Sequence, residues 1–113
     1  MKPSFLIGYP VNAETNPEAY ARYVGDCAQA EAVEAGLIAA GVSAYAAELE
    51  WRDLNIRARD VYQAACYGMT QGEYDAEKEK IRRRIHRQAR HRRAYYDRCI
   101  EKKDARENPS DND

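Results

Sequence analysis

The 113-residue sequence has no apolar run that could cross a membrane, and the apolar stretch near its start, SFLIGY, is too short for the core of a secretory signal. It also has little cysteine. Cys27, Cys66 and Cys99 are odd in number and widely spaced, which argues against a disulfide framework and favours reduced thiols. Reduced thiols are typical of proteins inside the cell. These absences predict a cytoplasmic protein with no membrane partner.

Motifs for catalysis and for cofactors are missing as well. The sequence contains no glycine-rich phosphate loop, no nucleophile elbow, no metalloprotease signature and no Glu-x-x-His pair. Its two histidines, His86 and His91, are five residues apart and would point about 140° apart on a helix, so they cannot hold one metal ion together. We therefore expect no catalytic residue, no metal site and no cofactor, and a protein that binds rather than catalyses.

Strand patterns are absent beyond the first 16 residues, and helical patterns take their place. Apolar residues recur at helical spacing from about residue 17 to 40, from residue 44 to about 67, and from residue 71 to about 105. The turns between these segments are short, which makes successive helices antiparallel neighbours. The sequence therefore predicts an all-α fold, a small three-helix bundle with a long amphipathic, arginine-rich third helix.

The ends of these segments carry helix-terminating and helix-capping residues. Asn16-Pro17 suits the start of the first helix, and Gly41 suits its end. Thr70 followed by Glu73 matches the capping box at the start of the third helix. We predict an extended N-terminal arm at residues 1–16, a helical bundle at 17–106 and a disordered acidic tail at 107–113. The arm should pack on the bundle through its apolar residues, Phe5, Leu6, Ile7, Tyr9 and Val11.

The basic residues gather in one stretch, KEKIRRRIHRQARHRR, which spans residues 78–93. From Lys80 to Arg93, eight of 14 residues are Lys or Arg and none is acidic. On a helix, an apolar stripe that includes Ile81, Ile85 and Tyr95 leaves a broad basic side. The arginines that point away from this stripe are the predicted nucleic-acid or polyanion site: Arg82, Arg83, Arg87, Arg90 and Arg93.

The pattern RRRIHRQARHRR, at residues 82–93, resembles the arginine-rich helices of viral and phage RNA-binding proteins over about a dozen residues. We therefore expect a small regulatory protein that docks on nucleic acid or on a nucleoprotein complex through this helix. The size, composition and mixed charge of the chain suit a regulator encoded by a phage or a mobile element, such as an inhibitor of a host complex. Two other roles remain open for the arginines. They can form a solvated face that neutralises acidic residues of the first two helices, or they can bind an acidic protein.

The second helix has apolar residues on two opposite faces. One face includes Trp51 and Leu54, and the other holds Tyr45, Leu49 and Ile56. A helix in a three-helix bundle meets both neighbours on one side, so the second face needs a further cover. That cover is the arm, a second subunit in a homodimer, or a foreign partner. The alternative function is therefore a protein–protein inhibitor or adaptor that acts through this apolar face, with the arginines structural.

Overall fold

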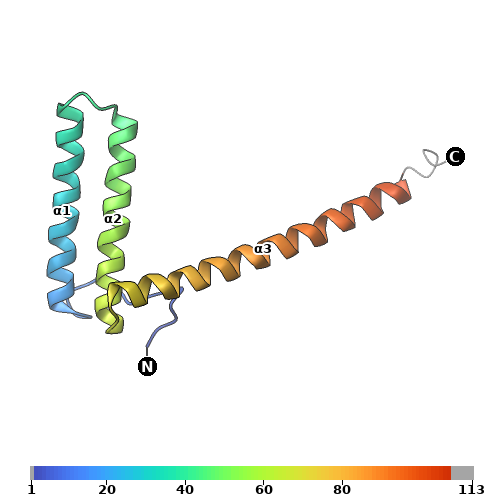
Figure 1. Ribbon diagram of the computed structural model, residues 1–113, viewed down its shortest axis with the longest axis horizontal. Helices are drawn as coiled ribbons and strands as arrows, with labels where there is room; N and C mark the ends of the chain where they lie inside the picture. The colour runs from blue at the N-terminus through green and yellow to red at the C-terminus, as the bar shows by residue number, and fades with distance from the viewer. Residues whose placement is uncertain (1, 108–113) are drawn as a thin grey trace. The chain divides into compact units, whose positions relative to one another are not determined.

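The structure is a computed structural model that describes residues 2–107. Within this range the chain forms three α-helices and no strand: α1 (Pro17–Ala39), α2 (Ala44–Tyr67) and α3 (Gln71–Glu107) (Figure 1). The all-α prediction is confirmed. Helix α3 extends one residue into the predicted acidic tail, and the remainder of that tail, residues 108–113, lies outside the described residues.

The starts of α1 and α2 follow from side chains that accept hydrogen bonds from the first free backbone N–H groups. Asn16 Oδ1 accepts from the N–H of Ala19 at 3.1 Å, and Ser43 Oγ accepts from the N–H of Ala46 at 3.2 Å. Helix α2 ends at Gly68, whose φ of 69° lies in the left-handed region that glycine tolerates. These caps confirm the predicted boundaries of the first two helices.

The capping box at the start of α3 has the reciprocal geometry that the sequence predicts. The N–H of Glu73 donates to Thr70 Oγ1 at 3.2 Å, and the N–H of Thr70 donates to Glu73 Oε1 at 3.4 Å. Two backbone donors that the helix itself cannot satisfy are thereby paired.

The chain divides into two compact units, residues 1–76 and residues 77–113, which are described separately. The first unit contains the arm, α1, α2 and the beginning of α3. The second unit contains α3 from Glu77 onward. The packing of the third helix against the first two, which the sequence predicts, stays a prediction.

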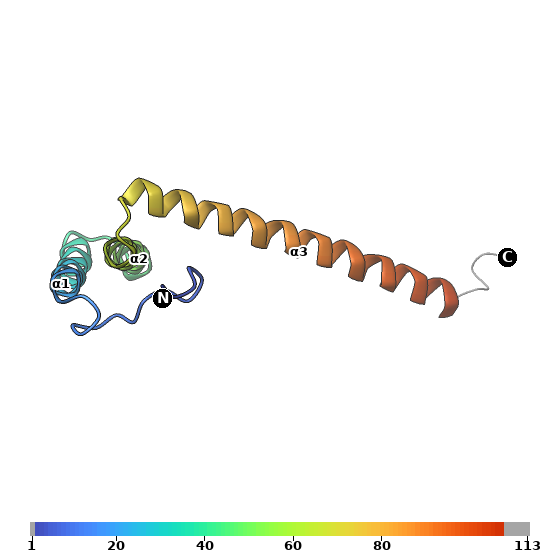
Figure 2. The same cartoon turned by 90° about the horizontal axis from the view of Figure 1, so that it is seen from below.

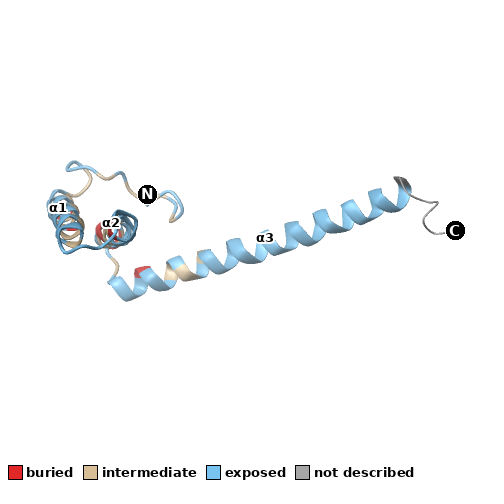
Figure 3. Cartoon of the chain, turned by 90° about the horizontal axis from the view of Figure 1, so that it is seen from above, coloured by how far each residue is buried: buried red, intermediate tan, exposed pale blue. Residues whose placement is uncertain are grey.

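In the first unit, α1 and α2 form an antiparallel pair joined by residues 40–43 (Figure 1). The buried residues between them are mostly alanines, Ala19 and Ala30 on α1 and Ala47 and Ala58 on α2. Small side chains let two helices approach closely. Tyr62 is the largest fully buried side chain of the described residues, with 1% of its surface exposed. Figure 3 shows the buried residues on these two helices and on the first turns of α3.

The N-terminal arm packs on the C-terminal half of α2, and Figure 2 shows it passing beside that helix. The centroid of the Phe5 ring lies 4.9 Å from the ring centroids of both Tyr67 and Tyr74. The ring centroids of Tyr9 and Tyr67 are 4.7 Å apart. Phe5 and Tyr9 pack on the bundle as the sequence predicts. Leu6 and Ile7 do not: their side chains are 69% and 75% exposed.

A turn explains this difference. The N–H groups of Ile7 and Gly8 both donate to the carbonyl oxygen of Ser4, at 3.0 and 2.8 Å. The tight turn places successive side chains on different sides, so Phe5 packs on α2 while Leu6 and Ile7 face solvent. A single run of apolar residues therefore divides between core and surface.

Side chains of α2 hold the arm by its backbone. Gln63 Oε1 accepts from the N–H of Tyr9, and Gln63 Nε2 donates to the carbonyl oxygen of Tyr9, both at 2.8 Å. The hydroxyl of Tyr62 donates to the carbonyl oxygen of Pro10 at 2.6 Å. At Gly8, where φ is 77°, an added Cβ would lie 3.0 Å from Gln63 Oε1, so this position requires glycine. The arm is therefore part of the folded unit.

The buried phenol of Tyr74 gives the first unit an alkaline pH dependence. Burial, with a smaller contribution from the nearby Asp60 carboxylate, raises the pKa of Tyr74 to about 12. An unfolded chain loses this proton near pH 10. Between these two values the folded state binds more protons than the unfolded state, so the free energy of unfolding falls as the pH rises. The stabilisation is complete below about pH 10 and is lost as the pH rises towards 12.

We expect Tyr74→Phe to reduce this alkaline loss, because phenylalanine keeps the ring against Phe5 but has no proton to release. Urea denaturation of both proteins at about pH 9 and about pH 11 measures how much the free energy of unfolding falls between these two pH values. Tyr45→Phe, at a tyrosine that is 72% exposed, is the matched control and should behave like the parent protein. An equal loss in the Tyr74→Phe protein and the parent would contradict the assignment.

Candidate nucleic-acid interface

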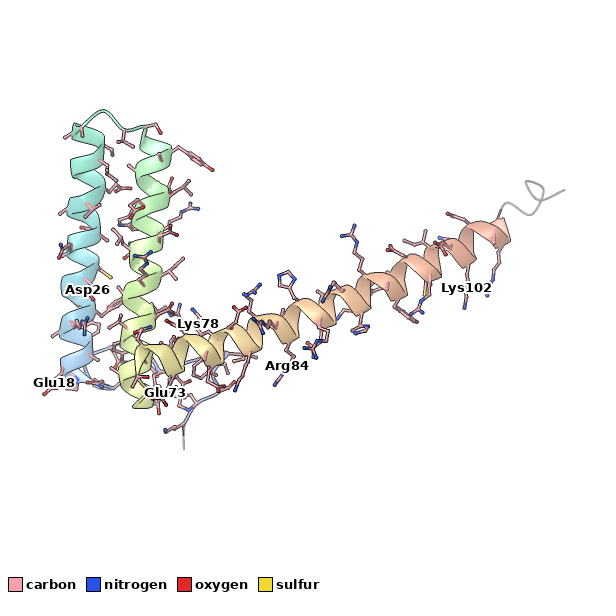
Figure 4. The ribbon with its side chains drawn as sticks, in the orientation of Figure 1. Glu18, Asp26, Glu73, Lys78, Arg84 and Lys102 are labelled. Atoms are coloured by element: carbon pink, nitrogen blue, oxygen red, sulfur yellow. The ribbon has the colours of Figure 1, made fainter. Side chains whose placement is uncertain are left out.

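The second unit is a helix whose side chains face solvent over most of its length. From Glu73 to Glu107 the sequence has neither glycine nor proline, and α3 is uninterrupted. All side chains from Arg82 to Arg106 are exposed. Figure 4 shows side chains projecting from this helix, with Arg84 and Lys102 labelled. The arginines of the predicted site are therefore presented on a continuous helical support.

Four of the five predicted arginines surround one shallow surface hollow of about 370 Å³. Its lining residues are Arg82, Arg83, His86, Arg87 and Arg90. At about 100° per residue, these positions and Arg93 fall within a strip of about 140° on α3. We call Arg82, Arg83, Arg87, Arg90 and Arg93 the basic face. The structure brings the first four together around the hollow, and helical spacing places Arg93 in the same strip.

One acidic residue lies at the N-terminal end of the basic face. Glu79 accepts a forked pair of hydrogen bonds from Arg82, at 2.6 and 2.8 Å, and a third from Arg83 at 3.1 Å. The hydrogen bond from Arg82, with that from Arg83, lowers the pKa of Glu79 to about 2. These pairs are solvent-exposed, so they are weak and can exchange for an external anion. Sequence reasoning missed Glu79, although its spacing of three and four residues signals such pairs.

The arginines farther along the basic face are not paired with an acidic side chain. Within residues 2–107, Arg87, Arg90 and Arg93 make no ion pair. For Arg87 and Arg90, no acidic residue stands three or four positions away in either direction, so their own helix offers no counter-charge. Asp97 stands four residues after Arg93, so the uncompensated positive charge of the basic face is at Arg87 and Arg90.

His86 also belongs to the hollow, which sequence reasoning did not anticipate. It stands four residues after Arg82 and four before Arg90, and this spacing is the signal that could have placed it there. A histidine between arginines adds a hydrogen-bond donor to the hollow.

The other predicted site residues lie in the first unit, on α2. Tyr45, Leu49 and Ile56 are 72%, 43% and 56% exposed. We call these three residues the α2 patch. They lie on one helix, at spacings of four and seven residues, and so share one face.

The three cysteines are free thiols, with Cys27 and Cys66 half-buried and Cys99 exposed. In the part of the chain that the structure describes, no group of three or more His, Cys, Asp or Glu side chains is arranged to hold a metal ion. No helix within residues 2–107 combines the length and the apolar character needed to span a membrane.

Comparison of the chain with protein-family models, with curated proteins and with solved structures found no match. The function is therefore inferred from the geometry and the charge of the chain itself.

Proposed function

We propose that the protein is a non-enzymatic nucleic-acid-binding protein whose basic face contacts backbone phosphates. The observation that carries this proposal is the set of arginines around one hollow, of which Arg87 and Arg90 lack any counter-charge on their own helix. Arginine forks onto phosphate with two parallel hydrogen bonds, which lysine cannot do, and the stretch from Lys80 to Arg93 holds seven arginines and one lysine.

The shape of α3 suits this role. An α-helix with its side chains is about 10–12 Å wide and fits the major groove of B-form DNA, which is about 12 Å wide. Arg82 and Arg87 stand at the two edges of the basic face, about 140° apart, and can reach phosphates on opposite walls of a groove. From Arg82 to Arg93 the helix is about 16 Å long, at about 1.5 Å per residue, which spans several phosphates.

Such a protein acts by occupancy. It covers a stretch of nucleic acid, or the nucleic acid of a nucleoprotein complex, and so regulates access to it. The origin in a phage or a mobile element, and the inhibition of a host complex, stay predictions that rest on the size, composition and mixed charge of the chain.

Replacing Arg83, Arg87 and Arg90 together with glutamine tests the proposal. Glutamine keeps helix propensity and removes three charges. We expect weaker binding to RNA and DNA duplexes. We also expect the slope of log affinity against log salt concentration to shrink by up to about three units, about one for each lost phosphate contact. Binding measured by fluorescence anisotropy over a range of salt concentrations gives both quantities.

The matched control replaces Arg98, Lys102 and Arg106 with glutamine. These residues lie on the same helix and change the net charge equally, but helical spacing places them outside the basic face. The control should keep most of the affinity. Equal losses in the two variants would show attraction by net charge without a site, and a parent protein that binds neither RNA nor DNA at low salt would refute the proposal.

A second candidate function is a protein–protein inhibitor or adaptor, and the exposure of the α2 patch favours it. Apolar docking at Tyr45, Leu49 and Ile56 does not weaken with salt in the way that phosphate binding does. A complex that withstands nuclease and high salt, and that Leu49→Asp abolishes, would support this candidate over the first.

A further inference from the structure

The α2 patch lies on the same face of α2 that the N-terminal arm covers nearer the end of the helix. The patch residues Tyr45, Leu49 and Ile56 share this face with Gln63 and Tyr67, which contact the arm. At about 100° per residue, the five positions fall within about 40° of one another on the helix. The arm covers this face at Gln63 and Tyr67. The α2 patch is the uncovered half of the same face, nearer the start of the helix.

Helix α3 carries a second exposed apolar surface. Ile81 and Ile85 are four residues apart, as are Tyr95 and Cys99, and the four side chains lie within about 80° on the helix. Gln88 and Arg92 occupy the helical steps between the two pairs. We call Ile81, Ile85, Tyr95 and Cys99 the α3 stripe. Ile85 is 51% exposed and Tyr95 is 60% exposed. Two apolar pairs on one side of a helix suit packing against another helix.

Charge decides which helix fits the α3 stripe. Arg92 lies within the stripe, and Arg84 and Arg98 flank it, with no acidic residue between Lys80 and Tyr96. Two α3 stripes facing one another would bring these cations together, which disfavours that pairing. The partner of the stripe should therefore be an apolar helical face with acidic surroundings.

The first unit offers such a face. Residues 1–76 hold five basic and 11 acidic residues, whereas residues 77–113 hold 13 basic and eight acidic residues, so the two units carry net charges of −6 and +5. Beside the α2 patch, Asp53 stands four residues after Leu49 and three before Ile56, one helical turn from each. Asp60 and Arg59 stand four and three residues after Ile56. Arg52, which also lies near the patch, is paired with Glu48 at 3.0 Å. One turn from the patch there are thus three acidic and two basic residues, so its immediate surroundings are acidic by one charge.

We propose that two copies of the chain associate, with the α3 stripe of each copy docked on the α2 patch of the other. A second copy supplies both surfaces at once, so one twofold pair covers both exposed apolar surfaces of each chain. The basic face lies on the other side of α3 from the stripe and stays exposed, so the dimer presents it twice. This inference does not rest on the proposed function, since it uses different residues.

The test measures the mass of the full-length protein by sedimentation equilibrium. The parent protein should be in a concentration-dependent equilibrium between monomer and dimer. Leu49→Asp and Ile85→Asp should each weaken the dimer by at least about 100-fold while circular dichroism stays unchanged, because each replaces an apolar contact with a carboxylate that must lose its hydration on docking. Val24→Asp, at a residue of α1 that is 48% exposed and outside both surfaces, is the matched control and should leave the dimer intact.

Mixing the two variants gives the sharpest result. A chain with Leu49→Asp keeps an intact α3 stripe, and a chain with Ile85→Asp keeps an intact α2 patch. The mixture should therefore form heterodimers through one intact contact, although neither variant dimerises alone. Raising the salt concentration from about 0.05 M to about 0.5 M should weaken the parent dimer, because the two surfaces attract one another by opposite charge. This second measurement needs no variant and so does not depend on the folding of any variant.

Four outcomes would overturn the inference. A parent protein that is monomeric at all concentrations, with Leu49→Asp stable and folded, would leave the α2 patch to a foreign partner. A monomeric parent that both aspartate variants destabilise would show that α3 packs on α2 of its own chain. A dimer that Ile85→Asp breaks and Leu49→Asp does not would show pairing of two α3 helices, and so would a dimer that salt strengthens.

Discussion

Replacing Tyr62 with alanine should lower the free energy of unfolding by about 3–5 kcal/mol, the range for a buried aromatic residue replaced by alanine. The Tyr62 side chain is 1% exposed, and its ring lies 5.9 Å from the Tyr23 ring. Its hydroxyl also donates to the carbonyl oxygen of Pro10 in the arm. The substitution therefore opens a cavity and loosens the arm together. Since small domains are stable by only about 5–15 kcal/mol, the loss is a large part of the total.

Two further substitutions separate these contributions. Tyr62→Phe keeps the ring and removes the hydroxyl, which donates to the carbonyl oxygen of Pro10 and accepts from the N–H of Asn12. It should cost about 0.5–1.5 kcal/mol for each hydrogen bond lost. Val24→Ala, at a residue that is 48% exposed and outside both the α2 patch and the α3 stripe, should change stability by less than about 0.5 kcal/mol. Urea denaturation followed by circular dichroism measures all three. If Tyr62→Ala and Val24→Ala had equal effects, Tyr62 would not be part of the core.

Replacing Ala89 with proline should break α3 in the middle of the basic face. Proline lacks the N–H that bonds to the carbonyl oxygen of Ile85 four residues earlier, and its ring clashes with that carbonyl, at a cost of about 3 kcal/mol or more. The break falls between Arg87 and Arg90, so the arginines on its two sides no longer share one rigid face. We expect a loss of helical circular dichroism and, under the proposed function, a loss of nucleic-acid affinity with no change in net charge.

The control places proline at the start of the same helix. Gln71 is the first residue of α3, where a proline ring fits and no helical hydrogen bond is lost. Gln71→Pro should keep both the helical signal and the affinity. If the Ala89→Pro protein bound nucleic acid as well as the Gln71→Pro protein, the basic face would not act as one surface.

The helices and their ends could be predicted from the sequence because the signals are local. A capping box needs only Thr70 and Glu73, three residues apart, and the observed hydrogen bonds join these two residues. The same holds for Asn16 and Ser43, whose partners are three residues away. The exposure of Tyr45, Leu49 and Ile56 agrees with the helical spacing, which places them opposite the buried Ala47 and Ala58.

The hydrogen bonds between α2 and the arm could not be predicted from the sequence. Gln63 and Tyr9 are 54 residues apart, and the hydrogen bonds between them go to backbone atoms that every residue possesses. No residue type in the arm signals such contacts. The turn at Ser4 likewise depends on backbone geometry, so the exposure of Leu6 and Ile7 is not visible in their apolar character.

The sequence predicted on which side of α3 the arginines of the basic face lie, but not the acidic residue that pairs with two of them. Counting residues on a helix places Arg82, Arg83, Arg87, Arg90 and Arg93 on one side, and the structure shows four of them around one hollow. The ion pairs with Glu79 do not follow from this count, because Glu79 lies outside the acid-free run from Lys80 to Arg93 and only its spacing of three and four residues signals them.

The arm has a further consequence during protein synthesis, because its binding site on α2 is made long after the arm itself. Translation adds about 5–20 residues per second, so Gln63 follows Tyr9 by roughly 3–10 s. During that interval Phe5 and Tyr9 have no tyrosine of α2 to pack on, and they stay exposed beside Leu6 and Ile7. The emerging chain thus exposes an unprotected apolar segment until α2 is made, which is the kind of surface that chaperones on nascent chains bind.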